Sequence, residues 1–263
     1  MNNFCIFVGP IRTSTSWIYN CLKLSSAVDV SNNVKETYFF DVNYSKGIDW
    51  YLSHFTASHN ITCDFSPTIF STANVQTRLL DTFCKLKIVV ILRDPIERSI
   101  SHFHHLLAKG RCDNNIREAI IKYPDIISSS RYSSILPAWT SITDFDTLIL
   151  DFKLLNDDPQ LFLNQITDFL NIDPIRLTAE QSKPFGAKLA PKYPFLAKYF
   201  SLLSVYLRRI GLHSLVELLK KLGLRNVYSG GSLPPISSGD LRYLNDILLQ
   251  ESIFYKDFFN SDA

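Results

Sequence analysis

The sequence predicts an α/β protein in which helices flank a central parallel β-sheet. Short apolar runs that favour strands alternate along the chain with longer segments whose apolar residues have a helical spacing. The runs at 4–8 and 87–92 are apolar almost throughout, which is typical of parallel strands buried on both faces. An alternation of strands and helices gives a parallel sheet whose ligand lies at the carboxyl ends of the strands.

The individual elements follow from the same patterns. Strands are expected at 4–8, 61–64, 87–92 and 147–152. Helices are expected at 15–24, 47–54, 73–84, 95–109, 116–122, 133–141, 159–170, 195–210, 212–222 and 240–253. The helix at 195–210 is apolar around much of its circumference, so we expect it to be buried, self-associated or resting on lipid. Residues 229–235, which are rich in Gly, Ser and Pro, predict a loop.

Length and composition favour one globular domain that spans residues 1–263, or at most two small domains. Apolar residues make up 46% of the 263 residues, which is enough for a full core. The five cysteines are an odd number without a CxxC pair, which favours reduced thiols over a disulfide framework or a zinc site. We find no signal-peptide pattern and no apolar run of the about 20 residues that cross a bilayer. We therefore expect a cytoplasmic protein.

The charge is unevenly distributed. The net charge is +2, but the segment from Lys183 to Arg225 has nine basic residues against one acid, Glu217, and the rest of the chain carries −6. We interpret residues 183–225 as a basic helical insertion within the single domain. Such a segment can serve an anionic acceptor or make peripheral contact with a membrane. We expect no nucleic-acid partner.

A polar loop follows the first predicted strand. Gly9 and Pro10 end that strand, and the loop then runs through Arg12, Thr13, Ser14, Thr15 and Ser16 into a helix. Backbone N–H groups and the helix dipole bind phosphate at such a place, hydroxyl groups add donors, and Arg12 adds a positive charge. The alternative is an ordinary helix entry capped by a hydroxyl residue. The pattern G-x-x-x-x-G-K-[ST] is absent, which excludes the phosphate loop of nucleoside triphosphatases.

Two further stretches carry chemistry. The predicted strand at 87–92 ends at Arg93, with Asp94 as a helix N-cap and Pro95 as the first helical residue. Ser101 then lies about two turns into that helix. Between the two strands, the sequence KETYFFD at 35–41 sets the Glu36 carboxylate among aromatic residues.

Together these stretches resemble the sulfotransferases that use 3′-phosphoadenosine-5′-phosphosulfate (PAPS). The loop after the first strand resembles their 5′-phosphosulfate loop, and the pair Arg93 and Ser101, eight residues apart, resembles their 3′-phosphate site. KETYFFD resembles the E-x-x-F-F-D segment of the carbohydrate (heparan-type) branch and its bacterial relatives. A weaker likeness continues through 43–51, 64–67 and 131–139 and fades after about residue 170.

The resemblance implies a P-loop-like sulfotransferase fold and an enzyme. Its reaction would move a sulfuryl group from PAPS to a hydroxyl or amino group of a carbohydrate, lipid or small-molecule acceptor. Glu36 would act as the general base, and Arg12 would stabilise charge on the departing phosphate. The 5′-phosphosulfate would be held by Arg12, Thr13, Ser14, Thr15 and Ser16, and the 3′-phosphate by Arg93 and Ser101.

Each role has a structural alternative. Arg12 could form a surface salt bridge, Glu36 could pair with Lys35 or Lys46, and Arg93 could form an ion pair with Glu97 at the helix entry. Position 14 is usually Gly in the family, and Ser accepts a positive φ less easily.

The chain also departs from the family pattern. The carbohydrate branch often has His where Tyr38 stands and Lys where Phe65 stands, which weakens the case for a glycosaminoglycan acceptor but not for PAPS. The C-terminal Lys-Gly nucleotide loop of the family has no match. Of the histidines, His102 and His105 share a helix face, but no third ligand is placed, so we expect no metal site.

A second class of function stays open at this point. The chain could be a nucleotide-binding protein without catalysis that docks to an anionic surface or partner through 183–225. A kinase is disfavoured because the Mg²⁺-binding pattern is missing. Retention of a carboxylate at Glu36 favours the enzyme, since binding alone needs no base.

Overall fold

The computed structural model describes residues 3–31, 34–56, 60–179, 181–182, 190–191, 193–209 and 229–260. Contacts group the chain into two compact units. The first unit consists of Met1–Pro95, Ser129–Phe185 and Gln250–Ala263, and the second of Ile96–Ser128 and Gly186–Leu249. The helix predicted at 212–222 lies outside the described residues, as does most of the basic segment. A single domain over 1–263 stays a prediction.

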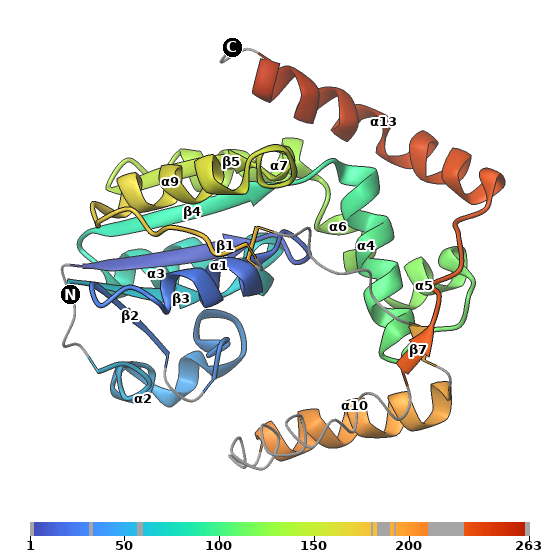
Figure 1. Ribbon diagram of the computed structural model, residues 1–263, viewed down its shortest axis with the longest axis horizontal. Coiled ribbons are helices and arrows are strands. Elements are labelled where there is room, and N and C mark those ends of the chain that lie inside the picture. The colour runs from blue at the N-terminus through green and yellow to red at the C-terminus, as the bar shows by residue number, and fades with distance from the viewer. Residues whose placement is uncertain are drawn as a thin grey trace. The chain divides into compact units, whose positions relative to one another are not determined.

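The first unit contains the parallel sheet that the sequence predicts (Figure 1). Its strands are β1 (Phe4–Gly9), β2 (Val28–Val30), β3 (Ile61–Phe65), β4 (Leu86–Leu92) and β5 (Phe145–Asp151). They are all parallel and lie in the order β2-β3-β1-β4-β5. The four predicted strands are confirmed, whereas β2 was not predicted because three residues are too few to show a period.

Side chains alternate between two cores, one on each face of the sheet. In β1, Phe4, Ile6 and Val8 point into one core, and Cys5 and Phe7 into the other. The first core is covered by α2 (Ile48–Leu52), α3 (Val75–Thr82), α7 (Tyr132–Thr140) and the end of α13 (Ser238–Asn260). The second core is covered by α1 (Thr15–Leu22), α8 (Phe152–Asp157) and α9 (Pro159–Leu170). Burial on both faces explains why the strands are apolar almost throughout.

Capping residues fix the ends of α9, and the predicted bounds are confirmed. The Asp158 side chain accepts a hydrogen bond from the Leu161 backbone N–H, and Pro159 takes the first helical position. At the other end, Asn171 adopts a left-handed conformation with φ +57°. The helix buries Phe162 and Leu170 against the sheet.

Three short helical turns complete the regular structure of the first unit. They are the π-helical turn η1 (Phe39–Asn43) and the 3-10 turns η2 (Tyr44–Lys46) and η3 (Pro67–Ser71). The end of the segment KETYFFD thus lies in a π-helical turn, and the adjacent residues Phe39 and Phe40 are both buried in the first core.

The second unit is built mainly of helices. These are α4 (Pro95–Ala108, from Ile96 onward), α5 (Ile116–Lys122), α6 (Asp125–Ser128), α10 (Pro194–Arg209) and the first half of α13. Its core contains Phe103, Leu106, Ile116, Ala119, Ile126, Ile127, Leu244 and Leu248. Arg98 is fully buried and donates hydrogen bonds to the carbonyl oxygens of Asp125 and Ile126, so this arginine braces α4 against α6.

Two expectations need correction in the C-terminal part, and one alternative for a third element is excluded. Residues 229–231, expected in a loop, form β7 (Ser229–Gly231), which pairs antiparallel with β6 (Ala190–Pro191). The pairing partner lies far away in the sequence, so local composition does not reveal it. The last helix extends to Asn260, beyond the predicted end at 253, because Phe254, Phe258 and Phe259 pack against the first core. Helix α10 exposes Phe195, Tyr199, Leu202 and Tyr206, so burial is excluded for this face, while the alternatives of self-association and contact with lipid stay open.

The exposed face of α10 does not make it a membrane-spanning segment. Among the residues that the structure describes, no helix combines the length and apolarity needed to cross a bilayer.

Candidate active site

The residues predicted to bind the nucleotide follow the carboxyl ends of the central strands. In the register of the sheet, Gly9 of β1 lies beside Val90 of β4, and Leu92 of β4 lies beside Asp151 of β5. Because the strands are parallel, the loops after β1, β3 and β4 emerge at the same edge of the sheet. The β1–α1 loop and Arg93 therefore lie at the edge where open α/β sheets bind ligands.

The β1–α1 loop has an unusual backbone. Gly9, Arg12 and Ser14 have positive φ values of +97°, +80° and +60°. A Cβ atom on Gly9 would lie 2.6 Å from the Pro67 carbonyl oxygen, so only glycine fits beside the turn after β3. Ser14 adopts a left-handed conformation, which glycine adopts without steric strain. For a residue with a Cβ atom, this conformation costs about 1–2 kcal/mol.

Hydrogen bonds divide the loop hydroxyl groups into two roles. Thr13 is fully buried, and its Oγ1 donates to the Pro10 carbonyl at 2.7 Å, so this hydroxyl holds the loop together. Ser14 makes no side-chain hydrogen bond to the first turn of α1, and that turn contains no acidic residue. The N-terminus of α1 is therefore not capped by Ser14 and suits an anion.

Lys35 joins the loop to Glu36. Its Nζ atom lies 2.6 Å from Glu36 Oε1 and 3.1 Å from Oγ1 of Thr15, the first residue of α1. Tyr38 donates its hydroxyl proton to Glu36 Oε2 at 2.7 Å. The ion pair with Lys35, one of the alternatives for Glu36, is therefore present. It also brings Glu36 next to the proposed phosphosulfate loop.

The position of Glu36 is fixed by the aromatic residues that follow it. Phe39 stacks on the Tyr51 ring with 4.6 Å between ring centroids, and Phe40 meets the same ring at 5.3 Å. The Asn43 side-chain amide donates to the Thr37 carbonyl at 2.9 Å. These contacts anchor the segment in the core, so Glu36 emerges from a rigid turn.

A second carboxyl group, Asp64, lies buried at the end of β3. Burial raises its pKa to about 6, and the charge of the Glu36 carboxylate acts in the same direction. The Ser66 hydroxyl donates to Asp64 Oδ2 at 2.8 Å, which partly offsets the effect of burial. The sequence placed Asp64 in a segment of weak family likeness but did not indicate a titrating group.

Arg93 is oriented by aromatic residues at the end of β4. Its guanidinium carbon lies 4.6 Å from the centroid of the Phe152 ring, and the Tyr132 hydroxyl donates to its carbonyl oxygen at 2.8 Å. The guanidinium is therefore stacked at the carboxyl edge of the sheet. Arg93 belongs to the first unit and Ser101, on α4, to the second, so their joint contact with a 3′-phosphate stays a prediction.

The histidines of α4 have structural partners. His102 Nε2 lies 3.6 Å from Asp125 Oδ2, and His104 Nε2 lies 3.2 Å from the Pro234 carbonyl oxygen. Burial lowers the pKa of His104. Within the part of the chain that the structure describes, no three His, Cys, Asp or Glu residues are grouped to hold a metal ion.

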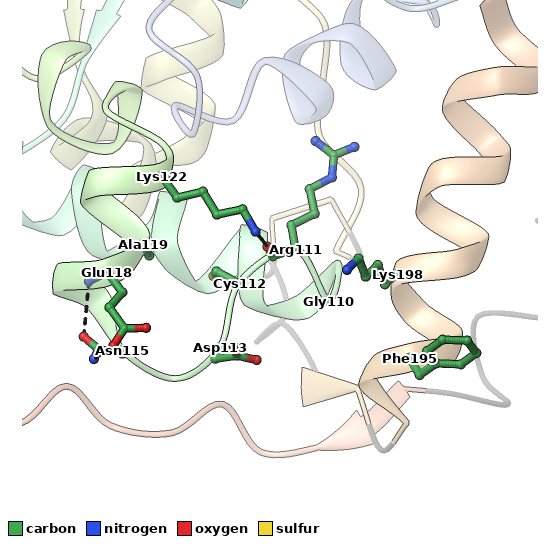
Figure 2. A pocket seen from close by; sticks show the side chains of 10 residues that line it. All are labelled: Gly110, Arg111, Cys112, Asp113, Asn115, Glu118, Ala119, Lys122, Phe195 and Lys198. Carbon is green, nitrogen blue, oxygen red and sulfur yellow. Dashed lines mark hydrogen bonds between the residues drawn. The ribbon is translucent and has the colours of Figure 1, made fainter.

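A pocket of about 330 Å³ lies in the second unit (Figure 2). Its walls come from α5, the turn before α5, and α10, and they include Arg111, Lys122 and Lys198. The Lys122 ammonium donates to the Arg111 carbonyl oxygen at 3.4 Å. None of the residues predicted for PAPS or catalysis lines this pocket, so it is not the predicted active site.

Comparison with known proteins identifies the family of the chain. The family described as "Sulfotransferase domain" matches residues 4–183. Bifunctional heparan sulfate N-deacetylase/N-sulfotransferase 1 of Caenorhabditis elegans is 27% identical over 185 residues, which is 64% of this chain and 22% of that protein. The corresponding enzyme 4 of Mus musculus is 28% identical over 214 residues, or 70% of this chain and 24% of that protein. The chain thus spans about a quarter of the length of these relatives, and the predicted likeness to the heparan-type branch is confirmed.

A solved structure shows the same fold. The sulfotransferase from Alicyclobacillus acidocaldarius superimposes with a TM-score of 0.60 at 17% identity, covering 82% of this chain and 96% of that one. The predicted sulfotransferase fold is therefore confirmed. With the family match extending over more than half of its residues, the chain belongs to the sulfotransferase domain family.

Proposed function

We propose that this protein transfers the sulfuryl group of PAPS to a hydroxyl or amino group of a carbohydrate acceptor. The observation that carries the proposal is the link through Lys35, which hydrogen-bonds both to Glu36 and to the first residue of α1. A carboxylate able to accept a proton thus lies beside the loop that suits the donor phosphate. A protein that only binds nucleotide has no need of this arrangement.

The donor would be held by the two loops at the sheet edge. The 5′-phosphosulfate would meet the N-terminus of α1, with Arg12 supplying positive charge and Ser14, Thr15 and Ser16 supplying N–H and hydroxyl donors. Thr13 would act indirectly, because its hydroxyl holds the loop. Arg93 and Ser101 would bind the 3′-phosphate, which distinguishes PAPS from other adenine nucleotides. The charges come from side chains and the helix dipole, and we propose no metal in the reaction.

The chemical step would follow the logic of phosphoryl transfer. The acceptor oxygen or nitrogen attacks the sulfur in line with the bond to the donor phosphate, and Glu36 takes the acceptor proton. The sulfur–oxygen bond to the phosphate breaks, leaving adenosine 3′,5′-bisphosphate. Arg12 stabilises the negative charge that develops on the leaving phosphate. An ionised carboxylate has about four acceptor sites, so Glu36 can accept a proton while it keeps its hydrogen bonds from Lys35 and Tyr38.

A carbohydrate is the acceptor class that the relatives favour, since their names specify heparan sulfate. In this chain Tyr38 and Phe65 differ from residues common in that branch. Tyr38 contacts Glu36 directly, so the difference falls within the base's surroundings. Lipid and small-molecule acceptors therefore belong in the same test.

We propose that the protein is cytoplasmic and makes peripheral contact with a membrane through residues 183–225. Helix α10, which lies in this segment, contains Lys198, Arg208 and Arg209 and no acidic residue. Its exposed side chains Phe195, Tyr199, Leu202 and Tyr206 have the spacing of one helical face. Aromatic residues beside basic ones are typical of helices that lie on anionic lipid.

Incubation with radiolabelled PAPS and a panel of acceptors tests the proposal. The panel would contain desulfated and N-deacetylated heparan chains, glycolipids and small hydroxyl or amino compounds. We expect label in at least one acceptor, and loss of that label in Arg12→Ala. If the protein binds adenosine 3′,5′-bisphosphate but transfers no label, the alternative of a non-catalytic nucleotide-binding protein gains support.

A further inference from the structure

We propose that Lys35 is a further catalytic residue, whose ammonium group contacts the sulfuryl group during transfer and stabilises the charge on its oxygens. The inference rests on the proposed function and assigns to Lys35 a role beyond its ion pair with Glu36. The sequence suggested Lys35 only as a structural partner of that carboxylate.

The first argument is the position of the ammonium group. Its two hydrogen-bond partners are Thr15, at the start of the helix that would face the donor phosphate, and Glu36, the proposed base. In an in-line transfer, the sulfuryl group passes between the donor phosphate and the acceptor atom that the base deprotonates. Thr15 would lie at the donor end of this path and Glu36 at the acceptor end. An ammonium group that is hydrogen-bonded to both residues would therefore lie beside the sulfuryl group.

The second argument is hydrogen-bonding capacity. An ammonium group has three N–H donors. In the described part of the chain, Glu36 Oε1 and Thr15 Oγ1 are the acceptors that Lys35 meets. The third donor can meet a sulfuryl oxygen while both contacts are kept.

The third argument is the environment of the charge. The Lys35 side chain is 21% exposed, and its Nζ atom lies 5.9 Å from the centroid of the buried Phe65 ring. A charge on a partly buried, aromatic surface is less screened than one in water, so its attraction for developing negative charge is stronger. The side chain is also held in place before substrate arrives, which limits reorganisation during the reaction.

Lys35→Met tests this role because methionine keeps much of the length and removes the charge. We expect kcat to fall by about 10²–10³, the scale for loss of one group that stabilises transition-state charge. Affinity for adenosine 3′,5′-bisphosphate, which has no sulfuryl group, should stay within about twofold of the wild type, because the nucleotide contacts remain. Lys256→Met, on the exposed surface of α13, is the matched control and should behave as wild type.

A double variant separates direct contact from positioning of Glu36. If Lys35 acts on the sulfuryl group, Lys35→Met should lower the residual rate of Glu36→Gln further, by about the same factor as in the wild type. If Lys35 only positions the base, the double variant should be as active as Glu36→Gln alone, and the proposal is wrong. Lys35→Arg keeps the charge and should regain part of the rate. If Lys35→Met folds poorly, the rate of Lys35→Arg still tests the role of the charge.

The outcomes also distinguish this inference from the proposed function. If the wild type transfers label and Lys35→Met has a kcat within about threefold of it, the role of Lys35 is excluded while sulfuryl transfer stands. If the wild type transfers no label to any acceptor, the proposed function fails and the inference fails with it.

Discussion

The Ser66 hydroxyl donates a 2.8 Å hydrogen bond to Asp64 Oδ2, two residues earlier at the end of β3. This bond stabilises a carboxylate that has no exposed surface. It does not fully offset burial, since the pKa of Asp64 remains raised from 3.8 to about 6. The stability of the protein should therefore depend on the ionisation of this residue.

Asp64→Asn should make the protein more stable at pH 8. Because the pKa of Asp64 is higher in the folded state, its contribution to stability is present below about pH 4 and is lost as the pH rises through about 6. Asparagine has no such loss, so the gain at pH 8 should approach roughly 3 kcal/mol and vanish near pH 4. Urea unfolding of both proteins at the two pH values measures it. Parallel stability curves for the two proteins would contradict the raised pKa.

Arg93→Ala should weaken the binding of adenosine 3′,5′-bisphosphate by about 2–3 kcal/mol, the scale of a charge-assisted hydrogen bond. Affinity for adenosine 5′-phosphate should change little, because that nucleotide lacks the 3′-phosphate. Arg93→Lys keeps the charge but loses the forked donors and weakens the stacking on Phe152, so it should be intermediate. Calorimetry with both nucleotides provides the measurement. Equal losses for the two nucleotides would exclude a dedicated 3′-phosphate contact.

Gly9→Ala should destabilise the protein more than Gly47→Ala. Both glycines have a positive φ, +97° and +82°, so both substitutions incur backbone strain of about 1 kcal/mol or more. Only at Gly9 would the new Cβ also meet the Pro67 backbone, at 2.6 Å from its oxygen, whereas nothing lies within 4 Å at Gly47. The difference between their unfolding free energies thus isolates the contact between the β1–α1 loop and the turn after β3. Equal destabilisation would show that this contact is not tight in solution.

The double variant Phe195→Ser and Tyr199→Ser should lower binding to vesicles that contain anionic phosphatidylglycerol. Both side chains are exposed on α10, so their loss removes apolar contact with lipid without opening a core. Nucleotide affinity should be unchanged. Replacing Lys220 and Lys221 by Glu should also lower vesicle binding and leave nucleotide affinity unchanged, because it removes positive charge that attracts anionic lipid. If either change lowers the affinity for adenosine 3′,5′-bisphosphate as strongly as the affinity for vesicles, the basic segment belongs to the nucleotide site.

The sequence predicted the sheet well because its evidence is local. The apolar runs of β1 and β4 and the Asp158–Pro159 start of α9 each carry their signal within a few residues. By contrast, β2 is three residues long, and β7 exists through pairing with the distant β6. Neither could be recognised from composition or period.

The site was predictable in its parts but not in its connections. The positive φ anticipated at position 14 is present, since Ser14 has φ +60°. The role of Lys35 depends on a contact with Thr15, twenty residues earlier in the chain, which follows from tertiary packing. The raised pKa of Asp64 likewise depends on burial between the sheet and the aromatic residues of the first core, which no spacing reveals.

The turnover of Glu36→Gln tests the central claim, that Glu36 is the base of a sulfuryl transfer. Glutamine keeps the shape of the side chain and loses the basic oxygen, so adenosine 3′,5′-bisphosphate should bind as before. Loss of a positioned general base lowers the rate by about 10²–10⁴, and we expect a kcat reduced by this factor. The melting temperature, measured on the same preparation, should stay close to that of the wild type. A stable Glu36→Gln protein with near-normal turnover would contradict the account.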